Sequence, residues 1–103
     1  MIEIEASSLS QQLSQPGAPL VLDVRNPPEV QAEGAIEGAL CIPMDQLPAR
    51  LKEVPADREI VAVCARGMRS ANTAHWLRAQ GRRADSLQGG MNQWKALGLP
   101  VKK

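Results

Sequence analysis

Cysteine, histidine and aromatic residues are scarce in this chain. Its 103 residues include two cysteines, one histidine and two tryptophans, with no tyrosine and no phenylalanine. Two cysteines do not make a disulfide framework, and a single histidine leaves no obvious ligand set for zinc. The apolar runs are too short to cross a bilayer. These absences argue against a disulfide-stapled, zinc-stabilised or membrane-spanning protein, and they leave chemistry at a single thiol.

The length and composition indicate one globular unit. The chain is 44% hydrophobic and 22% charged, which is an ordinary globular balance. A chain of this length is shorter than two domains usually require, so we expect a single domain over residues 1–103 with one modest core. Glu3 and Glu5 stand where a secretory signal has basic residues, which predicts a cytoplasmic protein with no membrane contact.

Charge is distributed unevenly along the chain. Residues 1–59 carry four basic and ten acidic side chains, whereas residues 60–103 carry eight basic and one acidic. Five arginines and no acid lie between Cys64 and Ala84. A reactive group there would lie in a field that favours anions, and a merely solvated surface is the alternative interpretation.

Strand patterns alternate with helix patterns. We expect strands at Ile2–Glu5, at Leu20–Val24, at Ala39–Ile42, at Ile60–Val63 and at Ala84–Leu87. We expect helices from Ser7 or Ser8 through Leu13, from Pro27 or Pro28 through Glu33, over residues 45–51, over residues 70–80, and around Trp94 and Leu97. This order predicts an α/β fold, with a small open parallel sheet of four to five strands and helices on both faces. The terminal Lys102 and Lys103 are expected to fray.

Cys64 follows the clearest strand and precedes a short loop and a helix. Ligands bind at that position in open α/β sheets. The loop runs through Cys64, Ala65, Arg66, Gly67, Met68, Arg69 and Ser70. Its backbone N–H groups, together with those that begin the helix, predict an anion site with the sulfur at its centre. An inert core cysteine needs neither two adjacent cations nor such a loop, so we favour a reactive thiol.

The same loop resembles the active-site loop of the rhodanese-like domains. The family pattern C-x-x-G-x-R-S is matched at Cys64, Gly67, Arg69 and Ser70. Three further stretches are similar to family motifs. Residues 22–25 with Glu29 are similar to D-V-R-x-x-x-E, and residues 34–43 are similar to G-H-I-x-G-A-x-x-I-P. Residues 87–90 with Trp94 are similar to L-x-G-G-x-x-x-W, and residues 98–101 are similar to the G-x-P-V tail. The chain departs from the family pattern at Ala35, where the family has histidine, and at Val30, where an aromatic residue is common.

The resemblance implies a thiosulfate sulfurtransferase that needs no metal and no organic cofactor. Cys64 would accept a sulfane sulfur from a small anionic donor such as thiosulfate, hold it as a persulfide, and pass it to cyanide, a thiol or a protein sulfur carrier. Backbone N–H groups from Ala65 to Ser70 would hold the sulfur. Arg66 and Arg69 would attract the donor, so Arg69→Ala is expected to raise the KM for the donor.

Residues on neighbouring strands are candidates for supporting roles. Asp23 and Arg25 end the second strand, where they could pair with each other or with Glu29 and shape the floor of the site. Cys41 could resolve an oxidised Cys64 as a disulfide, although core packing is the favoured interpretation. His75 lies too far along its helix to form a dyad with the cysteine.

Three other function classes are less consistent with the sequence. Cysteine-dependent phosphatases and arsenate reductases have five residues between cysteine and arginine, whereas Cys64 and Arg69 have four between them. A binding module without turnover commonly lacks the cysteine that is present here. A nucleic-acid partner is not expected, because the basic half lacks stacking aromatic residues and a known motif.

Overall fold

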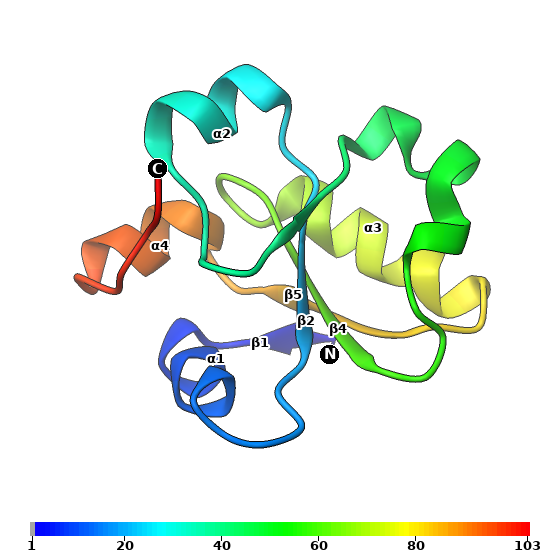
Figure 1. The fold of residues 1–103 in the computed structure, drawn as a ribbon, viewed down its shortest axis with the longest axis horizontal. Coiled ribbons are helices and arrows are strands. Elements are labelled where there is room, and N and C mark those ends of the chain that lie inside the picture. Colours follow the sequence, from blue (N-terminus) through cyan, green and yellow to red (C-terminus); the bar gives the residue numbers. More distant parts are fainter. Residues whose placement is uncertain (1) are drawn as a thin grey trace.

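The structure, a computed structural model, describes residues 2–103 and contains a parallel sheet of five strands (Figure 1). The strands are β1 (Glu3–Ile4), β2 (Leu20–Asp23), β3 (Leu40–Cys41), β4 (Glu59–Val63) and β5 (Arg83–Leu87). Their order across the sheet is β1-β5-β4-β2-β3, and every neighbouring pair is parallel. The predicted open sheet is confirmed, and the first strand lies at one edge.

Helices cover both faces of the sheet, as the sequence predicts. They are α1 (Ala6–Leu13), α2 (Pro27–Glu33), α3 (Met68–Ala79) and α4 (Gly90–Ala96). Helices α1 and α4 lie on one side of the sheet and α3 lies on the other (Figure 1). Two 3₁₀ segments, η1 (Met44–Gln46) and η2 (Pro48–Glu53), connect β3 to β4. Within residues 2–103, no helix combines the length and the apolar character that spanning a membrane requires.

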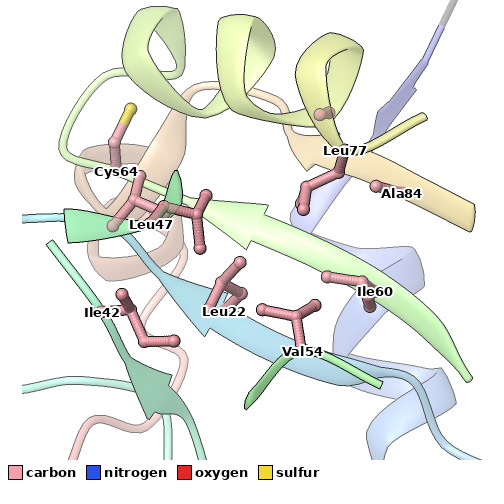
Figure 2. Packing of buried hydrophobic residues seen from close by; sticks show 10 residues of the cluster. Leu22, Ile42, Leu47, Val54, Ile60, Cys64, Leu77 and Ala84 are labelled. Carbon is pink, nitrogen blue, oxygen red and sulfur yellow. The ribbon is translucent and has the colours of Figure 1, made fainter. Parts of the chain in front are cut away.

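Each face of the sheet has its own apolar cluster, because successive side chains of a strand point to opposite faces. The cluster beneath α3 includes Leu22, Ile42, Leu47, Ile60, Cys64 and Leu77 (Figure 2). The cluster beneath α1 and α4 includes Leu9, Val21, Val61, Val63, Leu87 and Trp94. Cys64 is therefore both a member of the α3-side core and the residue from which the next loop departs.

One ion pair is buried inside the protein. The side chains of Asp23 and Arg25 are at most 1% exposed, and Nη2 of Arg25 lies 2.8 Å from Oδ2 of Asp23. The Nε atom of Arg25 donates to both carboxylate oxygens, at 3.0 and 3.2 Å, and Nη2 also donates to the carbonyl of Gly34 at 2.8 Å. Of the two predicted pairings, the structure therefore contains the one in which these residues bind each other.

Two helices begin earlier than predicted. Helix α1 starts at Ala6 and has no side-chain cap, so neither Ser7 nor Ser8 caps it. Ala6 is buried in the cluster beneath α1 and α4. This burial indicates that packing, rather than a capping residue, determines where α1 begins. Helix α3 starts before Ser70, at the residue after Gly67. Gly67 has a φ of +104°, and this left-handed conformation turns the chain directly into the helix.

Three predictions outside the long elements are wrong. The helix expected over residues 45–51 is two 3₁₀ segments, the second beginning at Pro48. The end of the chain is held in place, because Lys102 donates to the carbonyl of Ala35 at 2.7 Å and accepts from its amide at 3.0 Å. Cys41 is exposed rather than packed in the core, because it lies on an edge strand.

The buried ion pair yields a prediction about stability. We expect Asp23→Asn to lower the free energy of unfolding by about 3 kcal/mol or more, because Arg25 stays charged and buried without a counter-charge. The exposed Arg78–Asp85 pair, at 2.7 Å, provides the matched control. Asp85→Asn should cost less than about 1 kcal/mol. Urea denaturation measures both variants, and equal losses would contradict the prediction.

Candidate active site

The loop that follows β4 surrounds the sulfur of Cys64. The residue is only 1% exposed, and its sulfur points toward the beginning of α3 (Figure 2). The backbone amide of Gly67 donates to Sγ at 3.0 Å, and the amide of Ser70 donates to it at 3.3 Å. Backbone N–H groups therefore converge on one sulfur atom at the point where the strand ends, as the sequence predicts.

These contacts favour the thiolate form of Cys64. Burial alone raises the pKa of the thiol, since it disfavours the charged form. The hydroxyl of Ser70 and the amides of Ser70, Gly67 and Arg66 act in the opposite direction and outweigh burial. The pKa of Cys64 consequently lies below its ordinary value. The geometry thus supplies an anionic sulfur nucleophile closer to neutral pH than an ordinary cysteine does.

An open cavity of about 350 Å³ gives access to the sulfur. It is lined by Glu29, Cys64, Ala65, Arg66, Met68 and Arg69. Met68 is 79% exposed and lies at the rim, whereas Gly67 and Ser70 are buried behind the sulfur. In the part of the chain that the structure describes, no three His, Cys, Asp or Glu side chains are grouped to hold a metal ion.

The two arginines of the loop have different surroundings. Arg69 binds Glu29 through two parallel hydrogen bonds, each of 2.9 Å. The hydrogen bond from Arg69 is the largest factor that lowers the pKa of Glu29, to about 2, so the pair stays charged at neutral pH. Arg66 is exposed and forms no ion pair with any of residues 2–103. Arg66 is therefore the loop cation that is free to meet an anion.

Asp23 and Arg25 do not line this cavity, which corrects the expectation that they shape its floor. Leu22 and Val24 pack in the same cluster as Cys64, so Asp23 between them points to the opposite face of the sheet. Of the three predicted supporting residues, only Glu29 reaches the cavity.

Cys41 is poorly placed to form a disulfide with Cys64. It pairs with Asp23 on β2, which separates its own strand from β4. Two strand spacings amount to about 9.6 Å, beyond the Cα separation of about 7 Å that a disulfide tolerates. Its chain neighbour Ile42 packs in the same cluster as Cys64, so the Cys41 side chain points to the other face. Although the residue is exposed, partial burial of its thiol raises the pKa of Cys41.

The start of α4 holds the loop from behind, a role that the sequence analysis did not assign. The amides of Met91 and Asn92 donate to the carbonyls of Cys64 and Ala65 at 2.8 and 3.0 Å. In a peptide unit the carbonyl and the N–H of the following residue point in opposite directions. Because the carbonyls of Cys64 and Ala65 face α4, the amides of Ala65 and Arg66 point away from α4. A Cβ on Gly90 would lie 2.5 Å from the carbonyl oxygen of Cys64. The consecutive glycines were the available signal for this close approach.

A buried serine on β5 is a second residue that sequence reasoning missed. The Oγ atom of Ser86 lies 2.7 Å from the Oγ atom of Ser70, and both residues are fully buried. A serine inside a short strand carries no motif. Only the strand order, which brings β5 next to β4, places it behind the reactive loop.

Known proteins share both this fold and this sequence pattern. Residues 5–97 match the family described as Rhodanese-like domain. The chain is 41% identical over 100 residues to a sulfurtransferase from Allochromatium vinosum, a match that covers 96% of this chain and 92% of that protein. The crystal structure of a rhodanese-related protein from Thermoplasma volcanium is similar with a TM-score of 0.91 and 31% identity, covering 99% of this chain and 98% of that one. A rhodanese-like domain protein from Staphylococcus aureus has a TM-score of 0.88 and 35% identity, with both chains fully covered.

The contact between α4 and the loop can be tested with two glycine variants. Gly90 and Gly98 both have positive φ angles, +60° and +72°, but only Gly90 lacks space for a side chain. We expect Gly98→Ala to cost about 1 kcal/mol of stability through backbone strain alone. Gly90→Ala should cost at least about 2 kcal/mol more, because its methyl group must displace the loop. Urea denaturation compares the two, and similar costs would show that the close contact is unimportant.

Proposed function

This chain belongs to the rhodanese-like domain family, and from that premise we propose that it is a sulfurtransferase whose reacting group is Cys64. The observation that carries the proposal is the set of donors around the sulfur, with the amides of Gly67 and Ser70 at 3.0 and 3.3 Å. These donors stabilise a thiolate, which is the form that attacks sulfur. The identity to a sulfurtransferase over nearly the whole chain supports the same activity.

The proposed reaction has two displacement steps. The Cys64 thiolate attacks the outer sulfur of thiosulfate, a new S–S bond forms, and the S–S bond of the donor breaks as sulfite leaves with the bonding electrons. Cyanide or a thiolate then attacks the terminal sulfur of the resulting persulfide. The bond to Cys64 breaks and Cys64 leaves as a thiolate. One sulfur atom moves in each turnover, the enzyme ends as it began, and covalent catalysis divides one difficult transfer into two easier ones.

The residues around the sulfur take separate parts in this proposal. The loop amides hold negative charge on the cysteine and then on the persulfide, as preorganised donors do in other anion sites. Arg66, which has no acidic partner among the described residues, attracts the anionic donor. Arg69 and Glu29 fix the loop against α2. A cavity of about 350 Å³ suits a small donor, and because it is open a protein sulfur carrier could present its sulfur at the mouth of the cavity.

The proposal includes a cytoplasmic location. Cys41 and Cys64 are both free thiols, and a reducing compartment keeps a reactive thiol in that form.

A phosphatase is the less favoured function for this site. Arg69 follows Cys64 after four residues rather than five and is already bound by both oxygens of Glu29, and the unpaired Arg66 does not restore the longer spacing. Hydrolysis of p-nitrophenyl phosphate that is lost in Cys64→Ser would reverse this preference.

The persulfide can be detected directly by intact-mass measurement. After incubation with thiosulfate, we expect the wild-type protein and Cys41→Ser to gain one sulfur atom, which cyanide then removes. Cys64→Ser should gain none, because it lacks the nucleophile. A gain that persists in Cys64→Ser, or no gain in the wild-type protein, would count against the proposed function.

The two loop arginines should affect donor binding unequally. We expect Arg66→Ala to raise the KM for thiosulfate about three- to tenfold with little change in kcat, because an unpaired cation near the sulfur attracts the anionic donor. Arg66→Lys keeps the charge and should stay within about twofold of wild type. Arg69→Ala should raise KM less, since Glu29 already balances its charge. Steady-state kinetics decide the order, and an unchanged KM in Arg66→Ala would remove Arg66 from donor binding.

A further inference from the structure

Three buried side chains form a line of hydrogen-bonding groups behind the active-site loop. Cys64, Ser70 and Ser86 are each at most 1% exposed. The thiol of Cys64 lies 3.4 Å from Oγ of Ser70, which lies 2.7 Å from Oγ of Ser86. We propose that Ser86 is a positioning residue. Its hydroxyl donates a hydrogen bond to Oγ of Ser70, so that the hydroxyl of Ser70 is free to donate its own hydrogen bond to the sulfur. The inference deepens the proposed function, since it takes Cys64 as the reacting group.

The number of protons on the three side chains fixes the direction of each hydrogen bond. When Cys64 is a thiol, it donates to Oγ of Ser70, whose own proton can go to the carbonyl of Gly67 at 3.2 Å. When Cys64 is a thiolate, its sulfur only accepts, so the 3.4 Å contact with Ser70 is kept as a hydrogen bond only when the hydroxyl of Ser70 turns its single proton toward the sulfur. Oγ of Ser70 then has only lone pairs to offer to Ser86. In the thiolate state, Ser86 is therefore the donor in the bond between the two serines.

Ser86 has no alternative use for its hydroxyl. Among residues 2–103, Ser70 is the only hydrogen-bond partner of its Oγ atom. A buried hydroxyl without a partner is costly, so the proton of Ser86 is committed to Ser70. A hydroxyl that accepts one hydrogen bond becomes a stronger donor in the next, which strengthens the contact between Ser70 and the sulfur.

Two further observations support this assignment. The hydroxyl of Ser70 is the largest of the factors that lower the pKa of Cys64, so its orientation matters more than that of any single amide. Ser86 lies within β5, paired with Ala62 on β4 and with Glu3 on β1, which fixes its backbone on both sides. Ser86 does not line the cavity, so it acts on the sulfur only through Ser70.

The test follows alkylation of Cys64 by iodoacetamide across pH in Ser86→Ala, with each modified peptide quantified by mass spectrometry. We expect the midpoint of the rate profile to rise by about half a pH unit, because Ser70 no longer accepts the hydrogen bond from Ser86 that makes it a stronger donor to the thiolate. Ser86→Thr keeps a hydroxyl and should restore a midpoint close to that of wild type. The charged groups at the cavity, Arg66, Arg69 and Glu29, are unchanged in both variants.

The chain supplies two matched controls for this experiment. Thr73 lies on α3 one turn after Ser70 and is 3% exposed, and its hydroxyl has no partner in the described part of the chain. Thr73→Val therefore removes a buried hydroxyl nearby and should leave the Cys64 profile unchanged. The exposed thiol of Cys41 reports general changes in each sample and should react equally in all variants.

The outcomes separate this inference from the proposed function. An unchanged midpoint in Ser86→Ala, or an equal shift in Thr73→Val, would overturn the role of Ser86. Alkylation requires no sulfur donor, so a wild-type protein that gains no sulfur from thiosulfate would contradict the transferase activity and leave the result on Ser86 standing.

Discussion

The hydrogen bonds received by one buried sulfur are the interaction on which the site depends. The amides of Gly67 and Ser70 donate to Cys64, and the direction of these amides is set by the backbone around them. The left-handed conformation of Gly67 turns the chain, and α4 holds the carbonyls of the loop from behind. Gly67 and α4 therefore act on the chemistry by orienting peptide groups. Few side chains line the cavity that a reactant enters, and Arg66, Arg69 and Glu29 are the charged ones among them.

Much of this arrangement could be predicted from the sequence, because the signals are local. The apolar runs of β2 and β4 are typical of strands buried on both faces, and they appear in the structure close to the expected bounds. The order of loop, glycine and helix after Cys64 was sufficient to predict converging amides at the carboxyl edge of the sheet. The donors that converge on the sulfur therefore come from residues close to it in sequence.

The remaining features depend on which face of the sheet a side chain occupies and on which strands are neighbours. Asp23 ends the strand next to β4, yet its side chain belongs to the other face. Cys41 is separated from Cys64 by the same kind of alternation and by an intervening strand. Ser86 approaches Ser70 only because β5 lies beside β4. A one-residue change in register would reverse each of these placements, and no local pattern specifies them that finely.

The cavity that gives access to the sulfur has a kinetic consequence. Cys64 is 1% exposed and lines the cavity described above, and the buried residues Gly67 and Ser70 lie behind its sulfur. The sulfur donor and the sulfur acceptor must then use the same cavity one after the other. Each excludes the other while it is bound. Turnover by the proposed reaction would be strictly alternating, with a spent donor departing before the acceptor enters. An excess of acceptor would slow the enzyme by occupying the cavity while Cys64 carries no sulfur to transfer.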